Sequence, residues 1–351
     1  MTVLVSQSDL WKSSCWSELN SDPRGQRHTF TSISSKTHDT EKRGSGHRPR
    51  VLVLLASQNG EKWIAEQIQS ILEQEDVDVK VVVRDDASRD ATRLRIYPFL
   101  SANSVYLTGC EIPTGAAAQN YFALMRENAA DTFDYVAFSD QDDVWHTNKL
   151  SRACQALSAA TEAGYSSATV AKWAHGKTKL LTQARRESAS HFLFGGNGQG
   201  CTFVLTVALF QRVRAFLTDN RCLTTEIHYH DWAVYALAQT WNVPWIYDRA
   251  PSVDYRQHGK NDTGARLSIT GVRMRLLRIR QGWYGKQLKA IAALCAAADP
   301  MNSVVGKWNS ILSWPDTWSR RTHIVRFCML GGRRNFIDNA IVIFAALFGR
   351  I

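Results

Sequence analysis

Three aspartates crowd into one short stretch of the chain. Asp140, Asp142 and Asp143 directly follow the apolar run at residues 135–138, and Trp145 comes just after them. Carboxylates this close repel one another, so such a cluster persists where a cation neutralises it. Dense oxygen ligands suit a hard divalent ion such as Mg²⁺ or Mn²⁺, which also binds phosphate oxygens. A solvated acidic turn is the alternative, but the apolar and aromatic flanks favour a metal–phosphate site.

A second acidic cluster, Asp85 and Asp86 followed by Ser88 and Asp90, comes after a predicted buried strand at residues 79–83. A carboxylate at a strand end can accept hydrogen bonds from the base or ribose of a nucleotide. The alternative use of these residues is to cap a helix. Both uses are compatible, because one aspartate can cap while the other binds.

The elements that must position these clusters alternate between strands and helices. Residues 51–55 are a continuous apolar run typical of a strand buried on both faces, and the mostly apolar stretches at 79–83 and 134–138 predict two further strands. Apolar residues at helical spacing predict helices over residues 64–72 and 119–130. This alternation predicts an α/β fold with a Rossmann-like, mostly parallel sheet flanked by helices. Ligands of such sheets bind beyond the carboxyl ends of the strands, so the acidic clusters should converge there.

The composition is that of a folded protein with reduced thiols. The chain has 351 residues, of which 44% are hydrophobic and 21% charged, enough for one large domain with appendages. The seven cysteines lie far apart and form no CxxC pair, which argues against disulfides or a zinc site. The sequence has no run of 18 apolar residues and no apolar block typical of a signal peptide, so we expect a cytoplasmic protein.

The net charge of +10 is concentrated in the last part of the chain. Residues 270–351 carry 13 Lys/Arg against 3 Asp/Glu, whereas residues 50–269 carry 22 against 24. A basic segment usually meets phosphate, either of nucleic acid or of an anionic membrane. The slightly acidic middle argues against nucleic acid as a substrate of the main domain, and we expect no nucleic-acid partner.

An ordered series of motifs resembles family 2 glycosyltransferases: LASQNGEKWI at 55–64, QIQSILEQ at 67–74, RDDASRDAT at 84–92 and FSDQDDVW at 138–145. Two later stretches resemble the bacterial rhamnosyltransferase branch of that family: HDW at 230–232 and YRQHGKN at 255–261. The resemblance covers about residues 50–265, and the series is more specific than any single motif. It implies a GT-A fold, a nucleotide-sugar donor, a divalent metal and inversion at the anomeric carbon.

The resemblance also assigns residues to the donor. The first strand–helix turn of the family touches the nucleotide, which implies contacts from Ala56, Gln58 and Glu61. Asp86 resembles the acid that reads the base or ribose, and Asp140 is similar to the aspartate closer to the sugar-nucleotide.

The metal and diphosphate residues come from the same resemblance. Asp142 resembles the metal ligand of the D-x-D element, with Asp140 beside it. Arg256 and His258 are candidates for binding the diphosphate, and His258 could also ligate the metal. An ordinary hydrogen-bonded histidine is the alternative for His258.

On the acceptor side, Asp231 sits where the family places its general base. An acceptor hydroxyl must lose its proton as it attacks C1 of the donor sugar, and a nearby carboxylate can take it. Helix capping is the alternative for Asp231. The glycine-rich loop at 195–200, with Gly198 and Gln199, resembles the acceptor segment of the family, although a plain flexible connection would look the same. Trp232 could stack on a sugar face or pack in the core.

Three regions follow from these observations. We expect a polar, disordered extension at 1–49, a GT-A catalytic domain at 50–265, and a basic, mostly helical region at 266–351. In the last region, arginines interleave with apolar residues at 273–280, an apolar block covers 340–348, and four tryptophans occur (Trp283, Trp308, Trp314 and Trp318). This pattern favours contact with an anionic membrane surface, and a soluble helical subdomain is the alternative.

The sequence therefore predicts a metal-dependent, inverting glycosyltransferase, peripheral on the inner face of the cell membrane. The resemblance implies transfer of L-rhamnose from dTDP-L-rhamnose to a cell-surface glycan or a polyprenyl-diphosphate-linked oligosaccharide. The same fold using a UDP-sugar is one alternative. A catalytically silent partner that binds a nucleotide or glycan is another, although Asp86, Asp140, Asp142 and Asp231 together favour an enzyme.

Overall fold

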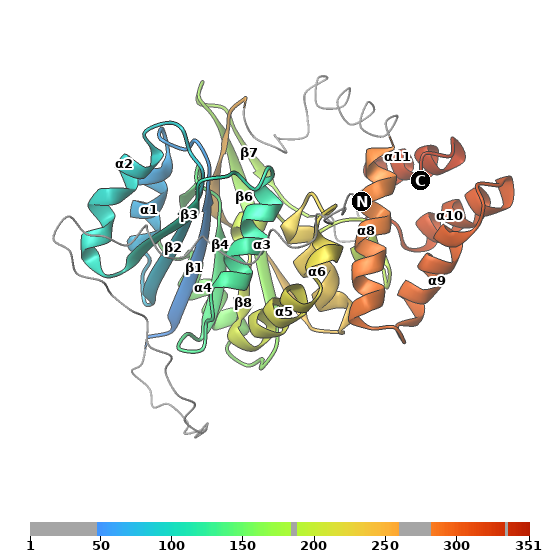
Figure 1. Cartoon of the computed structure of the whole chain (residues 1–351), viewed down its shortest axis with the longest axis horizontal. Helices are drawn as coiled ribbons and strands as arrows, with labels where there is room; N and C mark the ends of the chain where they lie inside the picture. Colours follow the sequence, from blue (N-terminus) through green and yellow to red (C-terminus); the bar gives the residue numbers. More distant parts are fainter. Residues whose placement is uncertain (1–47, 184–187, 260–281, 334–335) are drawn as a thin grey trace, which may run out of the picture. The chain divides into compact units, whose positions relative to one another are not determined.

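The computed structural model describes residues 48–183, 188–259, 282–333 and 336–351, as a sheet with helices on both faces followed by C-terminal helices (Figure 1). The strands are β1 (Arg50–Ser57), β2 (Asp78–Asp86), β3 (Val105–Cys110), β4 (Tyr135–Ser139), β5 (Val144–Trp145), β6 (Gly164–Trp173), β7 (Thr178–Leu181), β8 (Val204–Thr206) and β9 (Trp245–Gln257). The helices are α1 (Ile64–Leu72), α2 (Thr92–Ile96), α3 (Ala117–Glu127), α4 (Lys149–Leu157), α5 (Val207–Asp219), α6 (His230–Thr240), α8 (Trp283–Ala298), α9 (Ser303–Ser313), α10 (Trp318–Gly331) and α11 (Phe336–Leu347).

The sheet brings the chemically interesting strand ends to one edge. Its order is β3-β2-β1-β4-β8-β6-β9-β5, with β7 paired to β6. Strands β3, β2, β1 and β4 are parallel neighbours, and Ser57 of β1 stands beside Asp85 of β2 while Leu55 stands beside Ser139 of β4. Strand β9 runs parallel to β6 and antiparallel to β5. The ends of β1, β2 and β4 therefore lie side by side, as the expected α/β fold requires.

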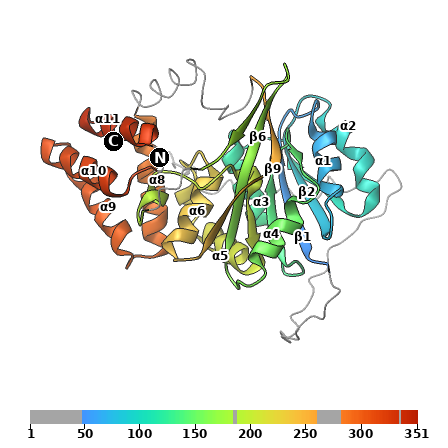
Figure 2. The ribbon, with the colours of Figure 1, turned by 180° about the vertical axis from the view of Figure 1, so that it is seen from behind.

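Two apolar cores lie on opposite faces of this sheet. Alternate residues of β1 serve the two cores: Leu52 and Leu54 pack with α3, α5 and α6, whereas Val51 and Val53 pack with α1 and α4. Figures 1 and 2 show the corresponding layers on either side of the strands. A strand that is buried on both faces reads as a continuous apolar run, which is why its sequence predicts it well.

The sequence-based elements agree closely with the structure over residues 50–140. Helix α1 spans Ile64–Leu72, the predicted range, because its isoleucines line one buried face. Helix α3 begins at Ala117 and ends at Glu127, three residues before the predicted end, because Asn128 is extended. The expected extension at 1–49 lies almost wholly outside the described residues, as do the basic stretch at 273–280 and the domain boundary at 265/266.

The C-terminal helices share one apolar core with helices α3, α5 and α6. Leu288 and Ile291 of α8, Trp308 of α9 and Ile324 of α10 are fully buried in the same apolar cluster as α3, α5 and α6. Among the described residues, no helix combines the length and the apolar character needed to cross a membrane.

The interpretation of Trp308 as a membrane-interface residue is wrong. Its side chain is 0% exposed and contacts the rings of Phe194 and Phe327, each with centroids 4.9 Å away. Trp283 is partly buried against the same core, while Trp314 and Trp318 are exposed (38% and 66%). Periodicity alone could not tell which tryptophans face the neighbouring helices.

Because Trp308 lies in the apolar core that the C-terminal helices share with α3, α5 and α6, Trp308→Ala should destabilise the whole described unit by about 3–5 kcal/mol through the cavity it leaves. Urea unfolding followed by far-UV circular dichroism and by tryptophan fluorescence should give one coincident transition. Trp318→Ala, an exposed tryptophan in the neighbouring helix, is the matched control and should change stability by less than about 0.5 kcal/mol. Equal losses for the two variants, or two separate transitions, would contradict the shared core.

Candidate active site

The turn after β1 is fastened to the acidic turn after β4. The side-chain oxygen of Gln141 accepts hydrogen bonds from Ser57 Oγ and Gln58 N, both at 2.9 Å, and its amide nitrogen donates to Gln58 O at 2.9 Å. A Cβ on Gly60 would stand 2.2 Å from Gln141 Oε1, so only glycine leaves room for this clamp. Gln141, between Asp140 and Asp142, thus fixes the turn after β1.

Asp86 lies at the end of β2 with its side chain buried. Its two carboxylate oxygens accept hydrogen bonds from the backbone N and the Oγ1 of Thr114, both at 2.8 Å. Arg84 Nη1 is 3.6 Å away, and the side chain of Gln58 donates to the Asp86 carbonyl at 2.9 Å. The structure therefore brings Asp86 and Gln58 together, as the sequence predicts, and adds Thr114 from the segment before α3.

Glu61 joins the same two turns from the other side. Its carboxylate accepts a hydrogen bond from Ala91 N at 3.0 Å, and its backbone N donates to Asp90 at 3.2 Å. The burial of Asp90 opposes its ionisation, but hydrogen bonds from Thr92 and from the Glu61 backbone outweigh this and lower its pKa. Glu61 thus contributes a carboxylate that holds the second acidic turn in place.

The three aspartates after β4 have different environments. Asp143 is fully buried, and burial, followed by the charges of Asp142 and Asp140, raises its pKa well above the ordinary value. Asp140 is partly exposed and accepts a hydrogen bond from Tyr121 Oη at 2.9 Å. Asp142 lies within hydrogen-bond distance of His258. The crowding expected from the sequence is relieved in a different way at each position.

Asp142 lies against the end of β9. Its Oδ2 is 2.7 Å from His258 Nε2, and its carbonyl accepts a hydrogen bond from Arg256 Nε at 3.0 Å. The other end of the Arg256 guanidinium pairs with Glu66 at 2.7 Å, and the Arg256 backbone N donates to Asp143 at 3.2 Å. The side chain of Arg256 therefore holds Asp142 in place, and its expected contact with the diphosphate stays a prediction.

A lysine is buried beneath the acidic turn. The Lys149 ammonium lies 3.4 Å above the ring of Trp145, and burial lowers its pKa to about 7. Asp143 contributes an opposing charge that favours the protonated lysine. Buried lysines are costly unless compensated, and the aromatic face of Trp145 offsets part of this cost. Sequence reasoning missed Lys149 because a lysine in an amphipathic helix normally faces solvent.

The donor set fits a hard divalent cation at Asp142 and His258. Neighbouring ligands of a six-coordinate Mg²⁺ lie about 3 Å apart, and the Nε2–Oδ2 separation is 2.7 Å. A second group, Asp140, Asp143 and Cys201, has ligand atoms within 4.8 Å of one another. Burial, followed by the charges of Asp143 and Asp140, raises the pKa of Cys201, and a protonated thiol does not suit a hard cation.

A pocket of about 230 Å³ opens beside this pair. His258 and Trp63 form part of its wall, together with charged residues of both signs. The lining residues are Asn59, Glu61, Lys62, Trp63, Asp90, His258 and Gly259. Sequence reasoning did not identify Lys62 or Trp63 as site residues. Their position between Gly60 and the start of α1, in the turn after β1, could have indicated it.

Asp231 lies in the first turn of α6, beside the glycine-rich loop. A Cβ on Gly200 would stand 2.8 Å from His230 Nε2 and 3.1 Å from Asp231 Cβ, so the loop needs glycine to approach α6 this closely. Gly198 and Gln199, in the same loop, are partly exposed. The predicted acceptor loop and the predicted base are thus neighbours.

His230 connects Asp231 to the acidic turn. Its ring stacks on Tyr121 with centroids 3.6 Å apart, and Tyr121 in turn donates to Asp140. Burial lowers the pKa of His230 to about 3, so the imidazole is neutral at physiological pH.

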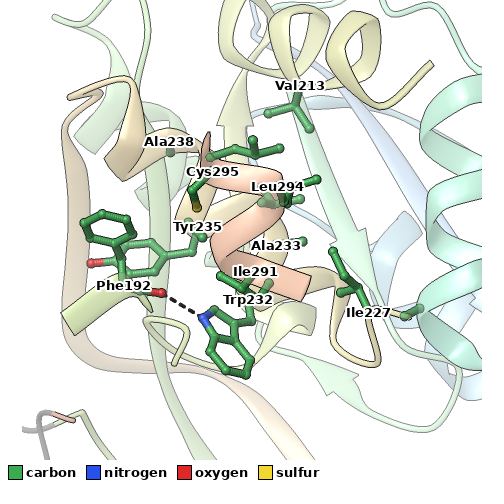
Figure 3. Packing of buried hydrophobic residues seen from close by; sticks show 14 of the residues in the cluster. Phe192, Val213, Ile227, Trp232, Ala233, Tyr235, Ala238, Ile291, Leu294 and Cys295 are labelled. Carbon is green, nitrogen blue, oxygen red and sulfur yellow. Dashed lines mark hydrogen bonds between the residues drawn. The ribbon is translucent and has the colours of Figure 1, made fainter. Parts of the chain in front are cut away.

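Two expected contacts are not supported by side-chain position. Trp232 is 4% exposed, and its indole N donates to the Phe192 carbonyl at 2.7 Å within the core (Figure 3). Core packing, the alternative interpretation, therefore describes Trp232 better than stacking on a sugar. Ala56 lies in β1 with its side chain in the same apolar cluster, because alternate residues of that strand face α3.

The fold and these motifs define a class of enzyme, and residues 52–201 match the family model described as glycosyl transferase family 2. The chain belongs to the family 2 glycosyltransferases. It is similar to "dTDP-rhamnosyl transferase RfbG" of Shigella flexneri, with 34% identity over 255 residues that cover 72% of this chain and 88% of that protein.

Two further likenesses are more distant. The "UDP-Glc:alpha-D-GlcNAc-diphosphoundecaprenol beta-1,3-glucosyltransferase WfgD" of Escherichia coli is 34% identical over 100 residues, covering 28% of this chain and 38% of that one. The crystal structure of S. aureus TarS 1-349 in complex with UDP has a TM-score of 0.53 and 14% identity, covering 86% of this chain and 89% of that chain. This last likeness shows the shared GT-A fold.

Proposed function

We propose that this protein is an inverting, metal-dependent rhamnosyltransferase that uses dTDP-L-rhamnose. The contact between Asp142 and His258 carries the proposal. It places an imidazole nitrogen, from the end of a strand distant in sequence, beside the carboxylate of the D-x-D turn. The similarity to the rhamnosyltransferase of Shigella flexneri supports the donor sugar. Asp86 and Gln58 at the neighbouring strand ends are the groups that would receive the nucleoside.

Asp142 and His258 would hold Mg²⁺ or Mn²⁺, with Asp140 nearby on the donor side. When bound, such a cation neutralises the charge that develops on the leaving diphosphate. Arg256 keeps Asp142 in position through its carbonyl, so the ligand is held before the donor arrives. Preorganised charge of this kind lowers a barrier without reorganisation during the reaction.

Asp231 would act as the general base. Its carboxylate stands at the start of α6 beside the loop that carries Gly198 and Gln199, where an acceptor sugar could lie against exposed backbone. Removal of the acceptor proton by Asp231 lets the hydroxyl attack C1 from the face opposite the leaving diphosphate, which inverts that centre. His230, being neutral, adds no competing positive charge beside this carboxylate.

Transfer from a UDP-sugar is the second candidate. The similarity of 100 residues to a protein named as a UDP-Glc-dependent glucosyltransferase favours it. That name also includes a diphosphoundecaprenol acceptor, which supports a lipid-linked acceptor here, in the assembly of a cell-surface polysaccharide such as an O-antigen.

A lipid-linked acceptor would be met at an anionic membrane surface, on the cytoplasmic side. Helices α10 and α11 and the residue after α11 expose large apolar side chains: Trp318 (66%), Met329 (61%), Leu330 (74%), Phe344 (57%) and Phe348 (61%). The net positive charge of residues 270–351 complements anionic lipid. Apolar side chains beside basic ones are typical of interfacial binding.

The donor and metal can be tested together by thermal shift. We expect dTDP with Mn²⁺ to raise the melting temperature more than UDP or GDP, since a ligand bound only by the folded state stabilises it. Asp142→Asn should remove the metal-dependent part of the shift, whereas Asp219→Asn, an exposed carboxylate of α5, should keep it. A preference for UDP would overturn the donor, and an intact metal-dependent shift in Asp142→Asn would overturn the metal site.

Replacing the proposed base should stop transfer without affecting donor binding. We expect Asp231→Asn to lower turnover by roughly 10²–10⁴-fold, the usual contribution of a general base. Transfer of labelled rhamnose from dTDP-rhamnose to the lipid fraction of bacterial membranes measures turnover, and the dTDP thermal shift measures binding. Near-normal turnover in this variant would exclude Asp231 as the base.

The membrane contact can be tested by co-sedimentation with phospholipid vesicles that contain anionic lipid. The double substitution Trp318→Ser and Leu330→Ser should weaken vesicle binding by at least about tenfold, because two large apolar side chains no longer enter the interface. Leu94→Ser with Ile112→Ser, two exposed apolar residues of the catalytic part, is the matched control. Unchanged sedimentation of the first variant would favour a helical subdomain that does not touch lipid.

A further inference from the structure

Trp63 lies outside the two apolar cores and faces the candidate metal residues. It occupies the position just before α1, is only partly buried, and belongs to neither of the two apolar cores formed by the described residues. Its indole ring instead stacks on the imidazole of His258, with centroids 4.1 Å apart and planes inclined by 11°. Because Trp63 does not pack in a core, its contact with His258 is the interaction that explains its position.

One edge of the His258 ring contacts Asp142. Nε2 of His258 lies 2.7 Å from Asp142 Oδ2, so the imidazole lies between the indole face and the carboxylate. The imidazole is largely covered, with its side chain 16% exposed. A ring covered on one face and bonded at one edge has few orientations left.

A second contact joins the same two segments. Glu66, three residues after Trp63, pairs with Arg256, two residues before His258. Trp63 is the residue before α1, and His258 is the residue after β9. The start of α1 is therefore fixed to the end of β9 at two adjacent points, and both points adjoin Asp142.

We propose that Trp63 is a positioning residue that orients His258 for cation binding beside Asp142. The inference rests on the proposed metal function of Asp142 and His258. A metal-binding imidazole must present one nitrogen along one direction, and the groups that fix its ring orientation commonly control metal affinity. The flat indole face restricts rotation of the imidazole, and both rings line the same pocket.

The test is Mn²⁺ affinity, measured on the full chain with dTDP present by the electron paramagnetic resonance signal of free Mn²⁺. Trp63→Ala should weaken Mn²⁺ binding by about tenfold, within the range found for residues that orient a ligand. Trp63→Phe keeps an aromatic face and should recover most of the affinity. Circular dichroism melting of each variant shows that it is folded.

The chain provides a matched control in Trp314, which contacts His323 at a centroid distance of 4.9 Å, far along the sequence from Asp142. Trp314→Ala removes a tryptophan from a histidine in the same way and should leave Mn²⁺ affinity unchanged. An equal loss in both variants would overturn the proposal, because it would show a general effect of removing a tryptophan.

His258→Ala and Asp142→Asn separate this inference from the function on which it rests. If both weaken Mn²⁺ binding while Trp63→Ala binds like the wild type, the positioning role is wrong and the metal site stands. If neither variant differs from the wild type, the metal assignment itself fails and Trp63 has no such role. Weakened binding in His258→Ala and Trp63→Ala, with recovery in Trp63→Phe, supports both.

Discussion

Three carboxylates within four residues impose the constraint on which the site depends. Their mutual repulsion would open the turn after β4 if all were ionised in the same environment. Asp143 is buried with a raised pKa, Asp140 is hydrogen bonded to Tyr121, and Asp142 is drawn to His258. Each aspartate therefore interacts with a different part of the fold: Asp143 with the core under the turn, Asp140 with helix α3, and Asp142 with the end of β9. The acidic turn thereby organises the structure around it.

The C-terminal helices are part of this organisation. Tyr284 of α8 donates to the Phe194 carbonyl at 2.9 Å, and Trp308 of α9 packs on the Phe194 ring. Phe194 directly precedes the glycine-rich loop, which in turn lies against the first turn of α6. The position of Asp231 relative to that loop therefore depends on helices encoded about a hundred residues later. This dependence gives the C-terminal region a role in the catalytic part whether or not it also touches lipid.

The central sheet was well predicted from the sequence because a strand that is buried on both faces has apolar residues at successive positions. Residues 51–55 are a continuous apolar run, and β1 is indeed buried on both sides. The convergence of Asp86 and Asp142 at one edge also followed, because parallel strands place their carboxyl ends together. The C-terminal region was harder to interpret. An apolar stripe predicts that one face of a helix is buried, but it does not show whether protein or lipid covers that face. Trp308 accordingly proved to be a core residue.

The contacts that complete the site could not be predicted from local pattern. Trp63 and His258 are almost two hundred residues apart in sequence, and neither shows a distinctive local spacing. What brings them together is the strand order, in which β9 lies beside β5, the strand that follows the acidic turn. The short antiparallel pair of Val144 with Asp254 and Trp145 with Val253 sets the register, so that His258, four residues after Asp254 and just past the end of β9, reaches Asp142. A slip of one residue in this pair would turn every side chain of β9 to the opposite face and remove His258 from the site. Strand β5 is only two residues long, yet its register with β9 decides which side chain at the end of β9 completes the candidate metal centre.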